Sequence, residues 1–99
     1  MLVVAARIKA KAGAADDLLG MFRDMVEWVS VNEPETLAYT CSRSTDDPDR
    51  FLFFERYTSR KAFEDHTSSE RFLAMVAGLQ GLVDGPIEID TYQEIAAKL

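Results

Sequence analysis

The chain has 99 residues, of which 47% are hydrophobic and 28% are charged, with only five glycines and three prolines. This composition indicates one globular domain over residues 1–99 and excludes a disordered, collagenous or low-complexity protein. Seventeen acidic and eleven basic residues give a net charge of −6, so the chain should repel phosphate backbones and we expect no nucleic-acid partner.

One cysteine and one histidine are present, and together they cannot build a zinc site of Cys and His ligands within one chain. The lone Cys41 cannot form an internal disulfide, which is typical of a reducing compartment. The apolar run at 1–6 ends at Arg7 and is too short for a signal-peptide core or a membrane span. We therefore expect a cytoplasmic protein with no metal and no membrane partner.

Hydrophobic periodicity predicts strands and helices along the whole chain. In chain order they are a strand at 2–10, a helix at 14–31, strands at 36–43 and 50–58, a short helix at 60–66, a second helical piece from about 67 to 83, and a strand at 87–95. Ser59 is the expected cap of the short helix. Thr67 to Glu70 fits a capping box, which would start the next helix at that point.

This order of elements predicts a ferredoxin-like α+β fold, βαββαβ, made of two βαβ halves. The expected sheet has four antiparallel strands. Right-handed crossovers would place all the helices on one of its faces.

Alternation places Leu37, Tyr39 and Cys41 on one face of strand 36–43. Strand 50–58 carries large apolar side chains on both faces, although the helices can cover only one. A second apolar face needs a partner, and a second copy related by a twofold axis is the simplest one. The sequence therefore predicts a homodimer through the sheet face that carries Val3, Ala5, Leu52 and Phe54.

Two segments carry a family signature. Residues 7–13 read RIKAKAG, and residues 53–66 read FFERYTSRKAFEDH, in which an acidic residue and an aromatic end a strand before a Ser, an Ala-Phe pair and a His. Together with Asp-Pro at 47–48 and Gly-Pro at 85–86, they resemble the antibiotic biosynthesis monooxygenase (ABM) domains. The resemblance implies a dimeric α/β barrel and three kinds of activity: cofactor-independent oxygenation of quinols and anthrones, haem degradation, and isomerisation of small metabolites.

The haem-degrading branch has an Asn, a Trp and a His where this chain has Ala6, Tyr57 and Val76. The resemblance therefore does not imply haem degradation here. Many quinol-oxygenase-like members carry a second His shortly after the first, at the position of Glu70 in this chain, and no role for Glu70 follows from the sequence.

His66 and Tyr57 are the candidate catalytic residues. His66 shares a helical face with Ala62 and Phe63, and an imidazole suits proton abstraction from an acidic phenol at neutral pH. The alternative is a helix-end histidine that only bonds backbone carbonyls. Tyr57 could donate a hydrogen bond to a substrate carbonyl or oxyanion, or it could be a core aromatic with its hydroxyl at the rim.

A set of aromatic and methionine side chains could leave a slot for a flat aromatic ligand between helices and sheet, or could simply fill the core. The candidate substrate-binding residues are Met21, Met25, Trp28, Tyr39, Phe53, Phe63, Phe72 and Met75. Glu55 lies on the same face as Tyr57, and an ion pair with Arg7 or Arg43 is expected to compensate its burial.

The resemblance, taken with His66 and this possible slot, implies a cofactorless monooxygenase that uses dioxygen to oxidise a quinol, an anthrone or a similar aromatic phenol, with His66 as the base. Two alternatives remain open at the level of sequence. One is a non-oxidative isomerase of a small metabolite on the same fold. The other is a non-catalytic, stress-related or ligand-binding dimer.

Overall fold

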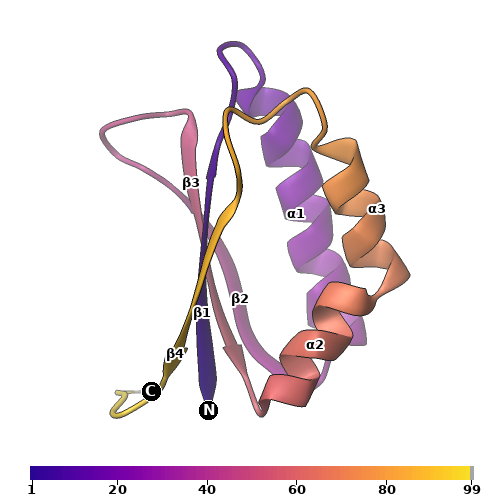
Figure 1. Ribbon diagram of the computed structural model, residues 1–99, viewed down its shortest axis with the longest axis vertical. Helices are drawn as coiled ribbons and strands as arrows, with labels where there is room; N and C mark the ends of the chain where they lie inside the picture. Colours follow the sequence, from indigo (N-terminus) through magenta and orange to yellow (C-terminus); the bar gives the residue numbers. More distant parts are fainter. Residues whose placement is uncertain (99) are drawn as a thin grey trace.

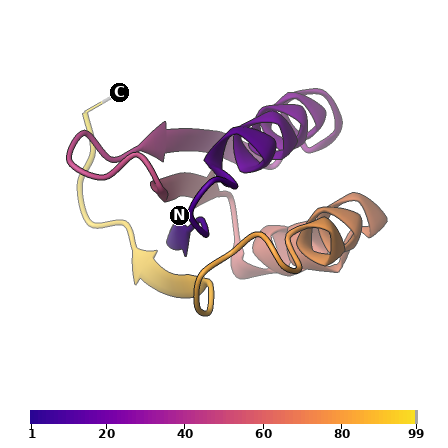
Figure 2. The same cartoon turned by 90° about the horizontal axis from the view of Figure 1, so that it is seen from above.

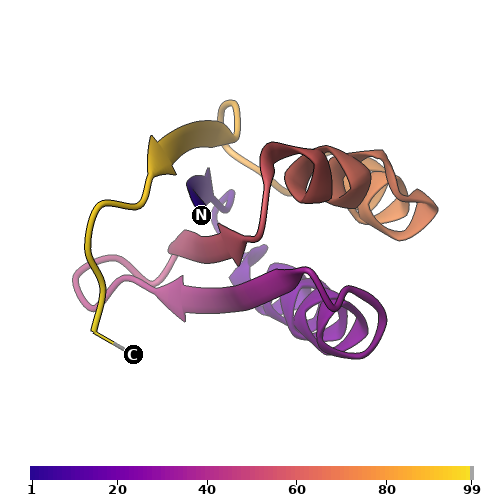
Figure 3. The same cartoon turned by 90° about the horizontal axis from the view of Figure 1, so that it is seen from below.

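The computed structural model describes residues 1–98 and shows a four-stranded antiparallel sheet with the strand order β2-β3-β1-β4. The strands are β1 (Leu2–Lys9), β2 (Thr36–Arg43), β3 (Arg50–Tyr57) and β4 (Glu88–Gln93), and the helices are α1 (Ala15–Asn32), α2 (Arg60–Ser68) and α3 (Glu70–Gly78). All three helices form one layer on a single face of the sheet (Figure 1; Figures 2 and 3). The predicted ferredoxin-like α+β fold is confirmed.

The core lies between the sheet and the helices. Alternate residues of β1 and β3 are buried on this side, as the period of two in their sequences predicts. They pack against the buried stripe of α1, which is formed by Leu18, Phe22, Met25 and Val29. Phe22 meets Phe51 and Phe53 edge-on, with ring centroids 5.3 Å and 4.9 Å apart.

Helix α1 ends before Pro34, whose ring excludes helical backbone at the preceding residue. The next residue after the helix, Glu33, still donates its backbone N–H to the carbonyl of Val29. The turn at 33–35 then leads directly into β2. This places Glu33 at the end of the helical layer, above the edge of the sheet.

Two predictions about the later helices are wrong. The helix after α2 is capped by Ser69, whose hydroxyl accepts the N–H of Phe72, and the Thr67 hydroxyl instead bonds the carbonyl of Phe63. The same helix ends at Gly78 and does not reach residue 83. Gly81 has a φ of 82°, which a helix cannot continue through, and Val83 then pairs with Ala10 at the end of β1.

The outer strands also differ from the alternation that their sequences suggest. A register shift between Thr36 and Ala38 leaves Leu37 45% exposed, so it does not share the buried face of Tyr39 as predicted. Strand β4 is shorter than the predicted 87–95 span, and Ile95 lies beyond it with 87% exposure.

Candidate active site

His66 occupies the last turn of α2 and is buried, with 2% of its surface exposed. Its Nδ1 lies 2.9 Å from both carboxylate oxygens of Glu33. A carboxylate can only accept, so Nδ1 carries a hydrogen and donates it to Glu33. In the neutral ring this leaves Nε2 with a free lone pair.

Glu33 was not among the predicted site residues. It follows α1, and its Oε1 also accepts a hydrogen bond from the Thr36 hydroxyl at 2.7 Å. The sequence does carry one sign of it, because an acidic residue at the C-terminal end of a helix is unfavourable unless it has a partner. Since the partner is 33 residues further along the chain, periodicity could not identify it.

Nε2 of His66 is the one buried side-chain nitrogen or oxygen within residues 1–98 that has no hydrogen-bond partner. Aromatic rings surround the imidazole: the ring centroids of Tyr39 and Phe72 each lie 5.0 Å away, and that of Tyr57 lies 5.7 Å away. Burying an unpaired polar atom costs about 1–3 kcal/mol. Such an atom is therefore a candidate contact for a ligand.

A small apolar cavity of about 40 Å³ lies between the sheet and helices α2 and α3. Its lining comes from all four strands or their flanks and from both helices: Val4, Ala6, Ile8, Tyr39, Phe53, Glu55, Phe63, His66, Thr67, Phe72, Met75, Val76, Ile87 and Ile89. Val76 on α3 and Ile89 on β4 are 37% and 48% exposed, so the cavity approaches the surface between these two elements.

An outer groove of about 260 Å³ lies on the other side of His66, at the ends of α1 and α2. Glu33 lines this groove but not the cavity, whereas His66 lines both. The imidazole thus forms part of the wall between them. With Nδ1 turned to Glu33 at the groove, the ring can take a proton on one nitrogen and release one through the other.

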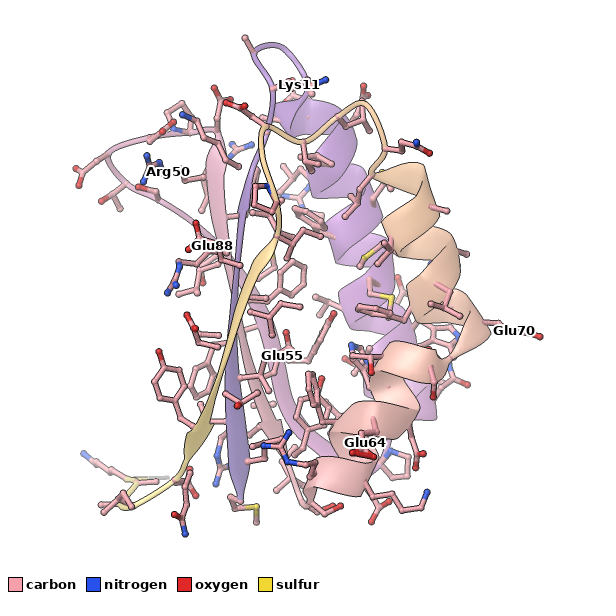
Figure 4. The ribbon with its side chains drawn as sticks, in the orientation of Figure 1. Lys11, Arg50, Glu55, Glu64, Glu70 and Glu88 are labelled. Carbon is pink, nitrogen blue, oxygen red and sulfur yellow. The ribbon has the colours of Figure 1, made fainter. Side chains whose placement is uncertain are left out.

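Glu55 is the second buried polar side chain in the cavity wall, with 5% exposure (Figure 4). The predicted ion pair with Arg7 or Arg43 is wrong. Arg7 lies on the opposite face of the sheet and pairs with Asp90 at 2.6 Å, while Arg43 stacks over the ring of Phe51. Glu55 instead accepts a hydrogen bond of 2.5 Å from the hydroxyl of Tyr57.

Burial raises the pKa of Glu55 to about 7, although the bond from Tyr57 opposes this rise and the charge of Glu33 adds to it. Burial also raises the pKa of Tyr39 and of Tyr57, with the Glu55 charge as the next cause for both. Both phenols therefore keep their protons at neutral pH. Of these three side chains, Glu55 is therefore the one whose charge can change near pH 7.

Known sequences and structures share the fold of this chain. Residues 1–78 match the sequence profile of the antibiotic biosynthesis monooxygenases. The chain belongs to the antibiotic biosynthesis monooxygenase (ABM) family. This match confirms the resemblance predicted from the sequence. The fold is monooxygenase-like, as in the ABM structures that it resembles.

Two solved structures and one further sequence illustrate the similarity. A crystal structure of an antibiotic biosynthesis monooxygenase superposes with a TM-score of 0.90 at 28% identity, covering 97% of this chain and 100% of that one. The protein PA3566 of Pseudomonas aeruginosa has a TM-score of 0.88 at 27% identity, covering 96% and 94%. An uncharacterized Synechocystis protein, sll1783, is 28% identical over 93% of this chain, which spans only 62% of its length.

The eight residues of the predicted ligand slot divide into two groups in this ABM domain. Tyr39, Phe53, Phe63, Phe72 and Met75 line the cavity beside His66. The other three members lie elsewhere: Met25 is fully buried in the core, Met21 packs near Gly78 between α1 and α3, and Trp28 lines the outer groove. Tyr57 is fully buried and does not line the cavity, but it contacts three residues that do: its hydroxyl bonds Glu55, and its ring packs against His66 and Phe63.

Glu70, at the position where many ABM members have a second histidine, is exposed in the first turn of α3 and projects away from the sheet (Figure 4). It therefore cannot act with His66 in this conformation. Within residues 1–98, no helix is long and apolar enough to span a membrane.

Proposed function

We propose that this ABM-family protein is a cofactor-independent monooxygenase that oxidises a quinol, an anthrone or a similar aromatic phenol with dioxygen. One observation carries the proposal: Nε2 of His66 is buried and unpaired in the wall of an apolar cavity, while Glu33 holds the other nitrogen. An oriented base next to an apolar space is what deprotonation of such a substrate requires.

In this mechanism Nε2 of His66 removes a proton from the substrate. The resulting electron-rich anion reacts with dioxygen directly, so no bound metal, haem or flavin is needed. Glu33 is the positioning residue, because it fixes the tautomer that leaves Nε2 free and stabilises the imidazolium that forms. The apolar lining keeps water away from the anion and from its peroxide product.

The cavity must widen to admit a ring, because a cavity that binds benzene has a volume of about 150 Å³. Helix α3 is the element that can move, since none of its residues is fully buried and Leu73 is 54% exposed. We place the entrance between Val76 on α3 and Ile89 on β4.

The proposed working form is a homodimer through the open sheet face. Leu52 and Phe54 are 40% and 41% exposed there, while the neighbouring Val3 and Ala5 are half-buried. Two such faces packed together would bury these side chains and complete the dimeric α/β barrel.

The test is oxygen uptake by the wild-type protein with a panel of quinols and anthrones, compared with His66→Ala. We expect turnover to fall by about a hundredfold or more, because positioned proton transfer contributes about 10²–10⁴-fold. Glu33→Gln should also lower turnover, while Glu35→Gln, an exposed acid two residues away, should not. The chain has one histidine, so the imidazole ¹⁵N spectrum reports whether Glu33→Gln changes the tautomer of His66.

Normal turnover in a stable His66→Ala protein would remove the base assignment. If His66 is structural, the variant should instead unfold several degrees earlier, and its residual activity should follow the folded fraction. Absence of oxygen uptake by the wild-type protein on the whole panel would contradict the oxygenase function.

A non-oxidative isomerase is the second candidate. The small volume of the cavity, about 40 Å³, favours it, because a small metabolite needs less widening than two fused rings. Solvent deuterium incorporated into a small carbonyl compound without oxygen uptake would select this function.

A further inference from the structure

Glu55 is a buried acid to which the mechanism above gives no task. It lines the same cavity as His66, and Tyr39 lies between them: Tyr39 is the register partner of Glu55 in β2, and its ring contacts the imidazole. No cation within residues 1–98 forms a salt bridge with Glu55, whose one side-chain hydrogen bond comes from Tyr57. A carboxyl buried in this way is costly unless it keeps its proton.

We propose that Glu55 is the proton donor of the cavity and that it delivers its proton to the peroxide oxygen that leaves as water. This inference rests on the proposed oxygenase function. Two side chains then have separate roles. His66 removes protons from the substrate carbon, and Glu55 donates a proton to the departing oxygen.

The steps balance for a methylene carbon between two aromatic rings, as in an anthrone. His66 removes the first proton, the carbanion gives two electrons to dioxygen as the C–O bond forms, and the imidazolium returns that proton to the peroxide. His66 then removes the second proton as the C=O bond forms and the O–O bond breaks. The departing hydroxide takes the Glu55 proton, and the imidazolium reprotonates Glu55. The sum is one methylene and one dioxygen converted into one ketone and one water.

The side chains around Glu55 favour Glu55 over Tyr39 or Tyr57 as the proton donor. The titratable groups that face it are Tyr57 on β3, Tyr39 on β2, His66 on α2 and Glu33 after α1. Burial raises the pKa of both tyrosines, which makes them poorer acids. Burial raises the pKa of Glu55 to about 7, so its acid form is present at neutral pH beside the cavity.

The experiment compares wild type with Glu55→Gln, and with Glu64→Gln as the matched control. Glu64 is an exposed glutamate on α2, outside the cavity (Figure 4). Wild type and control should form one ketone per dioxygen consumed. In Glu55→Gln the first deprotonation remains, so oxygen uptake should persist while the ketone yield per dioxygen falls about tenfold or more and hydroperoxide or hydrogen peroxide appears.

A second measurement needs no substrate. The infrared band of a protonated, buried carboxyl should be present at pH 6 in wild type, should be lost above about pH 8, and should be missing in Glu55→Gln. A Glu55 that is already ionised at pH 6, or a Glu55→Gln protein with an unchanged ketone yield, would overturn the inference while the oxygenase function stands. A wild-type protein with the band but without oxygen uptake would overturn the oxygenase function and this peroxide step together.

Discussion

Within residues 1–98, the imidazole of His66 makes none of the backbone contacts expected of a helix-end histidine, which supports the proposed role as a base. A structural histidine in the last turn of a helix would use its ring to satisfy free carbonyls. Here the N–H and the hydroxyl of Ser69 both donate hydrogen bonds to the backbone carbonyl of His66. The ring of His66 is left to bond Glu33 on one side and nothing on the other.

Glu55 should also make the stability of the protein depend on pH, because its pKa differs between the folded and the unfolded chain. Its usual value of 4.5 rises to about 7 on burial. Between these pH values the folded state holds the proton more tightly, so its stabilising contribution is complete below about pH 4.5 and is lost as the pH rises to about 7. Glu55→Gln should match wild type near pH 4 and exceed its free energy of unfolding by up to about 3 kcal/mol near pH 8.

Urea unfolding at both pH values measures this difference. Glu64→Gln is the control for a glutamate in water, and its difference from wild type should not change with pH. Parallel pH profiles for wild type and Glu55→Gln would mean that Glu55 titrates as an ordinary exposed carboxyl.

At the scale of the elements, the junction between α2 and α3 joins His66 to the helix that we propose moves to admit substrate. Ser69 ends α2 and begins α3: its hydroxyl donates to the carbonyl of His66 at 2.8 Å and accepts the N–H of Phe72 at 3.1 Å. Phe72 in turn contacts the imidazole. The start of α3 is therefore fixed next to His66, while its outer surface is exposed, with Leu73 at 54%.

Ser69→Ala removes both bonds of this hydroxyl. We expect a loss of about 1 kcal/mol, the usual contribution of a helix cap, and a fall in Tm of about 4–8 °C for a domain of this size. Ser68→Ala is the matched control, since Ser68 is exposed and caps no helix. Thermal unfolding followed by circular dichroism tests the difference, and equal Tm values for the two variants would show that the cap contributes nothing.

At the scale of the whole molecule, the sheet has one face covered by helices and one face without cover (Figure 2). The open face is not uniformly apolar, because Arg7 pairs with Asp90 there and Arg56 pairs with Glu94 at 2.8 Å. Apolar side chains lie between these pairs. Such a mixed surface suits a partner that satisfies both kinds of contact, as a second copy does under twofold symmetry.

Phe54→Lys should convert the proposed dimer into monomers, because the interface would bury a charge without a partner. Leu73→Lys is the control: Leu73 is more exposed than Phe54, at 54% against 41%, but it lies on α3 and away from the sheet. Light scattering at micromolar concentration gives the mass of each variant. A wild-type protein that is a folded monomer at that concentration would contradict the dimer.

Local patterns in the sequence determined the sheet and most of its helical layer. The period of two in β3 put Phe51, Phe53, Glu55 and Tyr57 on one face, and all four are buried there. The spacing of three and four in α1 likewise identified its buried stripe. These predictions hold because the side-chain period is a property of the backbone alone. The C-terminal end of α3 could not be predicted in this way. The apolar stripe continues past Gly78 in the sequence, but the positive φ of Gly81 and the pairing of Val83 with Ala10 end the helix.

The candidate site shows the limit of the same reasoning. The sequence by itself determined the fold, the buried face of each central strand and His66 as the candidate base. Only the tertiary structure decided that Glu33 holds His66, that Tyr57 rather than an arginine bonds Glu55, and that Trp28 and Met25 lie outside the cavity. The physical reason is the distance along the chain over which each kind of information acts. Periodicity relates residues within one helical turn or one strand. Hydrogen-bond partners and cavity walls instead come from segments that become close only after the helices have packed on the sheet.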